Sequence, residues 1–428
     1  MFKTLANAWR IPELRKKMLF TVFVVLIYRL GASLPVPYVS SSALSTIINA
    51  YGGSSIFSYL NILSGQAFSR ATLFALSVSP YITASIVIQL LTVAFPALQR
   101  LQKSGEDGRN KIKAITRYVT VGLAVITAYG YYAYMSSLDV VLNDGWFAAI
   151  VIIACYCAGA SLIMWLAEKI TENGIGNGVS IILFANIVSS FYMTAETIIS
   201  QFTKGWLHAI FAVISIIMII AIITLIVFVT NSERRLPVQY AKKVVGRKMY
   251  GGQNSNLPLK LDMSGVMPII FSSSIVSIPA TVNMIFPAKS NFWKKFVALF
   301  DTTSVLYVVL FIVLIFAFAY FYISISFDPV EVANNLKRNG GFIPGYRPGK
   351  PTADYISKVL KRITLIGAVF LAIIAGLPLI VNICARGYLG ALAFGGSSLL
   401  IAVGVALETS RQLEAQMTMR HYKGFLEQ

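Results

Sequence analysis

The chain has 428 residues, of which 57% are apolar and only 12% are charged. Soluble domains carry about 25% charged residues, because a folded globule must cover its surface with groups that tolerate water. The composition therefore excludes an ordinary soluble protein, and the mean hydropathy of +0.72 indicates lipid as the solvent. The formal net charge is +19, from 36 Lys and Arg against 17 Asp and Glu, and the distribution of these basic residues along the chain bears on its topology.

Ten apolar runs of roughly 20 residues are long enough to cross a hydrocarbon core of about 30 Å as helices. Each run is predicted to be helical, because only a helix satisfies its own backbone donors and acceptors in lipid. The first run shows no convincing cleavage site and is expected to stay in the protein. The predicted spans are residues 18–34, 72–95, 114–135, 146–168, 178–199, 208–231, 267–287, 303–327, 363–382 and 391–413.

The basic residues divide unevenly between the two sides of the membrane. When the loops are assigned to alternate sides, 29 of the 36 Lys and Arg fall on the side that holds both termini, and six fall on the other side. Arg29 lies inside the first span. Because loops rich in Lys and Arg stay in the cytoplasm, both termini are predicted to be cytoplasmic.

Ten spans divide into two sets of five near residue 205. Because five is odd, a second half that resembles the first must enter the membrane from the opposite side, as in inverted repeats whose interface holds the pathway. The sequence therefore predicts an all-α integral membrane protein. Its ten transmembrane helices form two pseudo-symmetric inverted five-helix halves, residues 1–205 and 206–428.

The outer loop at residues 35–71 contains a short apolar stretch, residues 56–63, which ends at Ser64 and Gly65. A stretch of about eight residues is too short to span the bilayer and too apolar for an exposed loop. Two interpretations fit this pattern. The stretch is either a re-entrant segment tucked among the helices or a helix that lies on the outer interface.

Prolines mark the second and seventh spans. Pro80 lies in the second span, and Pro268 and Pro279 lie in the seventh, with several Ser and Thr residues between them. Proline bends helices, and small polar residues are common where membrane helices contact each other. Both spans are predicted to be bent and polar-faced, as helices at a moving interface are.

Two cytoplasmic loops, residues 232–266 and 328–362, are long and basic. The positive-inside rule explains the basic residues beside the helix ends. It does not explain Arg247, Lys248 and Arg347, which lie more than about ten residues from any span among turn-forming Gly and Pro residues. These loop tips are predicted to bind anionic partners, either acidic protein surfaces or RNA phosphates.

The chain offers little reactive chemistry. It has no Walker motif, and the GIGNG run at 174–178 joins two membrane helices, which favours a tight, close-packed turn over a nucleotide site. The middle third of each span lacks His, Asp and Glu. This absence counts against a secondary transporter of a small solute, the main alternative to a passive conduit. An integral-membrane enzyme is disfavoured too, and we expect no catalytic residues, metal or cofactor.

Five long motifs resemble the SecY family, whose members are the central subunit of the bacterial protein-translocation channel. The motifs are SPYITASIVIQLL at 79–91, ITENGIGNGVSIILFANIV at 170–188, YAKKVVGRKMYGGQNSNLPLKLDMSGVMPIIF at 240–271, FDPVEVANNLKRNGGFIPGYRPGKPT at 327–352 and FGGSSLLIAVGVALE at 394–408. The resemblance implies a protein-conducting channel with two five-helix halves around a central hourglass pore. Polypeptides would cross through this pore, and membrane segments would leave it sideways into lipid.

The resemblance also implies a constriction ring of apolar side chains that closes around a moving polypeptide. Valine and leucine replace the family's frequent isoleucine at three of the matching positions, and they preserve size and apolarity. The matching positions are Val78, Ile82, Leu183, Ile270, Val282 and Ile401.

Two further elements follow from the resemblance. The stretch at about 58–68 resembles the family's plug, which favours the re-entrant interpretation and assigns Tyr59, Leu60, Asn61, Ile62, Leu63, Ser64 and Gly65 to it. The second and seventh spans would face each other across a lateral gate, to which we assign Thr83, Gln89, Ser274 and Ile278.

The implied partners are the SecE and SecG subunits, the motor ATPase SecA, the ribosome, polypeptides that carry a signal sequence, and membrane lipid. The implied location is the cytoplasmic (inner) membrane of a bacterium. Arg347 is the residue that we expect to couple most directly to SecA. The full set assigned to SecA and ribosome binding is Lys242, Arg247, Lys248 and Arg347.

Overall fold

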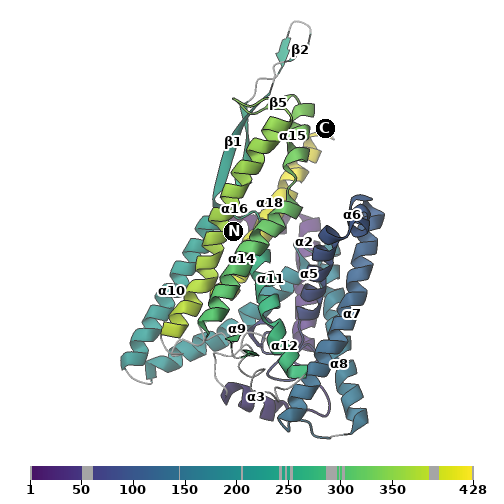
Figure 1. The fold of residues 1–428 in the computed structure, drawn as a ribbon, viewed down its shortest axis with the longest axis vertical. Helices are drawn as coiled ribbons and strands as arrows, with labels where there is room; N and C mark the ends of the chain where they lie inside the picture. The colour runs from purple at the N-terminus through teal and green to yellow at the C-terminus, as the bar shows by residue number, and fades with distance from the viewer. Residues whose placement is uncertain are drawn as a thin grey trace.

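The computed structural model describes residues 2–50, 61–143, 145–203, 206–240, 243–245, 248–250, 254–285, 296–297, 299–300, 304–384 and 395–426. Helices dominate it (Figure 1). The helices within residues 2–203 are α1 (Phe2–Arg10), α2 (Pro12–Gly31), α3 (Ser41–Ala50), α5 (Ser79–Ala94), α6 (Pro96–Lys103), α7 (Glu106–Ser137), α8 (Trp146–Asn173) and α9 (Gly178–Thr203). The helices within residues 206–426 are α10 (Trp206–Asn231), α11 (Met267–Val276), α12 (Ile278–Ile285), α14 (Val305–Ser326), α15 (Pro329–Arg338), α16 (Lys350–Cys384) and α18 (Gly395–Leu426).

Every predicted span coincides with one of these helices or, at residues 267–287, with the broken pair α11 and α12. Within the described ranges, five stretches of helix are long and apolar enough to cross a membrane on their own. They contain α7, α8, α10, α14 and α16. The protein is therefore a mostly helical, multi-pass membrane protein.

The second span bends at a different place from the one expected, whereas the seventh span breaks beside its second proline. Pro80 occupies the first turn of α5, where a missing N–H costs nothing, so it starts the helix and does not bend it. The second span instead turns by 102° after Phe95, where Pro96 begins α6. The seventh span breaks at Ser277, two residues before Pro279, as its proline predicts.

The membrane helices contact one another in a closed circuit. From α5 the contacts run through α7, α8 and α9 to α18 and α10, and return through α16, α14 and α11 to α5. Figure 1 shows α5, α7 and α8 on one side of the molecule and α10, α14 and α16 on the other, with α11 between α14 and α5. A circuit of this kind encloses a centre to which several helices contribute side chains.

A small antiparallel sheet joins the two basic loops. Its strands are β4 (Asn254–Lys260), β1 (Glu233–Tyr240) and β5 (Gly341–Phe342), in that order, and Val238 pairs with Ser255 while Tyr240 pairs with Gly341. The short strands β2 (Lys243–Val245) and β3 (Lys248–Tyr250) pair beyond it. Figure 1 shows β2 projecting at the end of the molecule opposite α3. The sheet was not predicted, although Leu236 and Val238 are buried with exposed Arg235 before them, which is the alternation of a half-buried strand.

Close packing between α8 and α9 depends on the GIGNG turn. A Cβ atom on Gly178 would lie 1.8 Å from the carbonyl oxygen of Ala167, so a larger residue would force the helices apart. Gly176 has a φ of +80°, which favours glycine. Asn177 caps α9, because its Oδ1 accepts hydrogen bonds from the amides of Val179 at 3.0 Å and Ser180 at 3.4 Å. The run forms a tight, close-packed turn, as expected.

Candidate functional site

Five of the six predicted constriction residues lie at the start of or on four helices and belong to one buried apolar cluster. Val78 is the residue that precedes α5, and Ile82 lies in its first turn. Leu183 comes from α9, Ile270 from α11 and Ile401 from α18. All five side chains are buried and belong to one continuous cluster of apolar side chains. Val282, on α12, is only partly buried and lies outside that cluster.

The predicted plug begins in residues that the structure does not describe, because Tyr59 and Leu60 lie outside the described ranges. Asn61 to Leu63 form a helical turn that ends at Gly65, whose φ is +62°. Asn61 stabilises the return of the chain, since its Oδ1 accepts a hydrogen bond from the amide of Ser69 at 3.0 Å. Ser64 does the same with the amide of Phe68, also at 3.0 Å. The segment is therefore a compact, internally bonded loop.

This loop is inserted among the helices. Ile62 and Leu63 pack against the central apolar cluster that contains the constriction residues. The carbonyl oxygen of Leu63 accepts hydrogen bonds from Asn186 Nδ2 at 2.8 Å and from Ser77 Oγ at 3.3 Å. The carbonyl oxygen of Ile62 accepts one from Ser190 Oγ at 3.2 Å. These contacts favour the re-entrant arrangement over a helix lying on the membrane surface.

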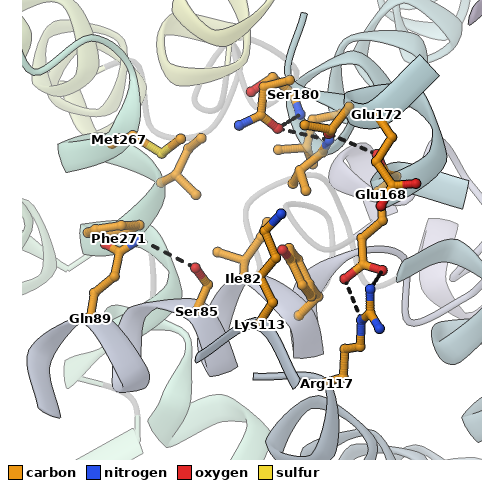
Figure 2. Close-up of a pocket in the computed structure, with 17 residues that line it drawn as sticks. Ile82, Ser85, Gln89, Lys113, Arg117, Glu168, Glu172, Ser180, Met267 and Phe271 are labelled. Carbon is orange, nitrogen blue, oxygen red and sulfur yellow. Dashed lines mark hydrogen bonds and ion pairs between the residues drawn. The ribbon is translucent and has the colours of Figure 1, made fainter. Parts of the chain in front are cut away.

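A cavity of about 210 Å³ opens between α5, α7, α8, α9 and α11. Three constriction residues, Ile82, Leu183 and Ile270, line it. Figure 2 shows that the remaining wall mixes polar and charged side chains, among them Gln89 of α5 and Ser180 of α9, with Met267 and Phe271 of α11. The lining of the cavity thus combines three of the predicted constriction residues with polar and charged side chains.

Two ion pairs lie on the α7–α8 side of this cavity. Arg117 of α7 donates from Nε to Glu168 Oε1 at 2.9 Å, and its Nη2 lies 2.7 Å from Glu168 Oε2, so the contact between α7 and α8 is bidentate (Figure 2). Lys169 Nζ donates to Glu172 Oε2 at 2.8 Å. Among the described residues, no group of three or more His, Cys, Asp or Glu side chains could hold a metal ion.

The residues assigned to a lateral gate lie on contacting helices. Thr83 and Gln89 are on α5, Ser274 is on α11, and α5 packs directly against α11. Ile278 starts α12, where its side chain is 46% exposed, and α12 packs against α7. The seam between the second and seventh spans is therefore closed at α11, and Ile278 faces outward.

The basic loop tips are described in part. Lys242 and Arg247 lie outside the described residues, and Lys248 begins β3. Arg347 is exposed in a turn held by its neighbours, because Tyr346 stacks on Tyr355 with ring centroids 4.1 Å apart. The hydroxyl of Thr352 donates to the carbonyl oxygen of Arg347 at 2.8 Å. The turn thus presents the Arg347 side chain to solvent on a fixed backbone.

Sequence reasoning missed the residues that contact the plug. Asn186 is fully buried in α9, and Ser190 lies one turn further along. Arg29 of α2 donates to the carbonyl oxygen of Ala185 and lies against Gly65. The available signal was composition, because Arg29 and Asn186 are polar residues inside apolar runs, and such residues in a membrane usually have a function.

A closed circuit of helices, with a cavity lined by Ile82, Leu183 and Ile270 and a loop inserted among the helices, is the arrangement of a membrane channel. The SecY family model matches residues 72–410. Protein translocase subunit SecY of Mycobacterium tuberculosis is 41% identical over 450 residues, with all of both chains covered, and that of Streptomyces scabiei is 42% identical over 444 residues with the same coverage. The chain belongs to the SecY family.

Solved structures show the same fold at low sequence identity. One, described as the structure of a protein conducting channel, has a TM-score of 0.68 and 16% identity, and the match covers 94% of this chain and 92% of the other. Sec61 in a canine ribosome-channel complex has a TM-score of 0.64 and 15% identity, with the same coverage.

Proposed function

We propose that this chain is a protein-conducting channel that passes unfolded secretory polypeptides across a bacterial cytoplasmic membrane. The observation that carries the proposal is the cavity lined by Ile82, Leu183 and Ile270, with the predicted plug packed against the apolar cluster that contains them. Membership in the family of the translocase subunit SecY supports it. A conduit of this kind needs no reacting groups on its own chain, because the energy for transport comes from a partner.

The constriction acts as a seal that adapts to its substrate. Narrow apolar constrictions exclude ions by dewetting, so aliphatic side chains close the resting pore. Aliphatic side chains form no directional bonds, so they can contact substrate side chains of different size. The plug adds a second barrier when no polypeptide occupies the pore.

Membrane segments leave sideways between α5 and α11. These helices contact each other through apolar side chains from the central cluster, among them Ile86 and Phe271. An apolar segment that enters this seam replaces one hydrophobic contact by another, so separation costs little when a suitable segment is present. Thr83, Gln89, Ser274 and Ile278 belong to this gate.

The proposal extends to topology and partners. Residues 1–205 and 206–428 form the two inverted halves, and both termini face the cytoplasm. SecE and SecG complete the complex. SecA and the ribosome bind the basic loops through Lys242, Arg247, Lys248 and Arg347, and the similar fold of Sec61 in a canine ribosome-channel complex supports the ribosome as a partner.

Reconstitution tests the function directly. Liposomes that contain this chain with SecE and SecG, supplied with SecA and a precursor that carries a signal sequence, should protect the precursor from added protease only when ATP is present. The matched control is the same liposome without ATP. No protected precursor, together with saturable uptake of a small solute, would favour the secondary transporter instead.

The role of Arg347 is tested in the same system. Arg347→Glu reverses the charge on an exposed turn and should abolish SecA-driven transport without changing assembly. Arg338→Glu is the matched control, because Arg338 is exposed in the same loop at the end of α15. Equal transport by both variants would mean that Arg347 has no specific role in coupling the channel to SecA.

A further inference from the structure

We propose that Arg29, Asn186 and Ser190 form a latch that holds the plug closed by its main chain. This proposal rests on the proposed channel function and names the side chains that regulate it. The plug and the helices that hold it are described by the structure from Asn61 onward, and the argument uses only those residues.

The contacts of the latch reach successive carbonyl groups. Asn186 Nδ2 donates to the Leu63 carbonyl at 2.8 Å, and Ser190 Oγ donates to the Ile62 carbonyl at 3.2 Å. Both donors lie on α9, about one helical turn apart. The Leu63 carbonyl also accepts from Ser77 Oγ at 3.3 Å and the Ile62 carbonyl from the amide of Gly65 at 3.0 Å, so the latch adds a donor from α9 to each of these groups.

Gly65 lets the latch close. A Cβ atom at this position would lie 2.7 Å from Arg29 Nη1 and 3.0 Å from Asn186 Oδ1. The positive φ of Gly65 also favours glycine. Arg29 is fixed from its other side by the Ala185 carbonyl. The guanidinium of α2 and the amide of α9 therefore touch the plug at the one residue that has no side chain to keep them away.

The burial of these groups strengthens their hydrogen bonds. Asn186 and Ser77 are almost completely buried, and Asn186 Nδ2 also lies 3.1 Å from Ser77 Oγ. A hydrogen bond in an apolar interior is stronger than in water, and a buried donor left without a partner is costly. The plug cannot leave unless water reaches these groups, so the latch couples plug movement to wetting of the pore.

Because the latch binds carbonyl oxygens, it does not depend on plug side chains. Substitution of Ile62 or Leu63 by another aliphatic residue leaves the hydrogen-bonded carbonyl in place. Removal of the donors on α9 releases the plug whatever its side chains are. This difference separates the latch from a simple apolar fit between plug and pore.

The experiment reports plug position through a single cysteine. Ala67 is 1% exposed in the closed plug, and Ala67→Cys adds one sulfur atom in a chain whose native Cys155, Cys157 and Cys384 have been replaced by alanine. The rate at which a membrane-impermeant maleimide labels this cysteine, and the ion leak of the same liposomes without substrate, are measured together. Both should be low in the otherwise unchanged channel.

Adjacent serines on α9 provide matched variants. Ser190→Ala removes a donor to the plug, whereas Ser189→Ala changes a side chain that lines a groove between α2, α9 and α18. Asn186→Leu should raise the labelling rate and the leak about 5- to 30-fold, because losing one or two buried hydrogen bonds changes an equilibrium by that factor. Ser190→Ala should give a smaller rise, and Ser189→Ala none.

The outcomes separate the latch from the channel function. Unchanged labelling and leak in both Asn186→Leu and Ser190→Ala, with normal ATP-dependent transport, would overturn the latch and leave the channel intact. Increased labelling in a chain that moves no precursor would support the latch and contradict the proposed function. A rise of equal size in Ser189→Ala would show general loosening of α9 and would also overturn the latch.

Discussion

The helices α7 and α8 and the helices α5 and α11 are held in place by different kinds of contact. Between α7 and α8, the Arg117–Glu168 ion pair is bidentate, and both helices are long and unbroken. On α5 and α11, polar side chains bond within their own helix instead. Thr83 donates to the Ser79 carbonyl at 3.0 Å, and Ser274 donates to the carbonyl four residues earlier at 2.8 Å.

This difference shows how one membrane protein can combine a fixed wall with a movable seam. Directional bonds between α7 and α8 must break before these helices separate. The contacts between α5 and α11 are apolar and have no preferred direction, so these helices can move apart without leaving a hydrogen bond unmade. Four changes test the comparison, and they follow in order of decreasing expected effect.

The largest effect is expected where α8, one helix of the wall, packs tightly against the segment that precedes α5. A Cβ atom on Gly159 would lie 2.1 Å from the carbonyl oxygen of Leu73, so Gly159→Ala should destabilise the protein by about 3 kcal/mol. Thermal unfolding of the detergent-solubilised protein measures this. Gly122→Ala on α7 is the control, because nothing lies within 4 Å of its Cβ position, and there alanine should stabilise the helix slightly. Equal melting temperatures would contradict tight packing at Gly159.

A pH-dependent effect is expected just before α11. Burial raises the pKa of Asp262 to about 6 from 3.8, despite hydrogen bonds from Gly265 and Ser264, and its Oδ1 has no partner among the described residues. As the pH rises through this interval, the unfolded carboxyl loses its proton first, so the native state loses stability, and the loss is complete above about pH 6.

Asp262→Asn removes this loss. The variant should be about 2 kcal/mol more stable than the parent protein at pH 7.5, and the gain should fall to about 0.5 kcal/mol near pH 4, where the native carboxyl is protonated and the unfolded carboxyl is only about half ionised. Thermal unfolding at the two pH values measures it. A gain of the same size at both values would mean that the effect comes from packing and not from ionisation.

A smaller effect is expected from the ion pair of the wall. Glu168→Gln breaks the bidentate contact with Arg117 and should cost about 1 kcal/mol, because the arginine is half exposed and can be hydrated. Glu172→Gln breaks the exposed pair with Lys169 on the same helix and should cost less than about 0.5 kcal/mol. Melting temperatures at low salt compare the two. A larger loss of stability in Glu172→Gln than in Glu168→Gln would mean that the exposed pair with Lys169 stabilises the protein more than the bidentate pair with Arg117.

The smallest effect is expected in the seam. Ser274→Ala removes a hydroxyl that is bonded within α11, so the free energy of unfolding should change by less than about 0.5 kcal/mol. The melting temperature measures this, and Gly159→Ala provides the contrasting result. A loss above about 1 kcal/mol would mean that Ser274 holds α11 to a neighbouring helix, which would contradict the proposed difference between wall and seam.

The sequence predicted the helical elements well because their signal is strong. A run of about 20 apolar residues has few structural solutions in lipid, and every such run became a helix or a broken helix. Helix ends were less predictable. The second span was expected from residue 72, but the left-handed backbone at Ser77 and the proline at position 80 delay α5 to Ser79.

The sheet and the latch were missed for different reasons. The strand β1 carries the alternation of buried Leu236 and Val238, but Pro237 interrupts the pattern, and its partner β5 is two residues long. The latch residues Arg29 and Asn186 stand out in the sequence because they are polar residues inside apolar runs. Their partners are main-chain carbonyls, which every residue has, so no pattern of side chains could indicate the contact. The constriction residues were assigned by resemblance, and burial in one cluster brings five of them together.

The strand β5 has a mechanical consequence. It pairs Tyr240 with Gly341 and Gln239 with Phe342, so backbone hydrogen bonds tie the two basic loops together. The turn with Arg347 leads directly into α16, whose 35 residues extend about 50 Å. A force on either loop is therefore transmitted through the backbone to the N-terminal end of α16. Force applied outside the membrane is delivered along α16 to α14 and α18, deep among the helices that surround the pore.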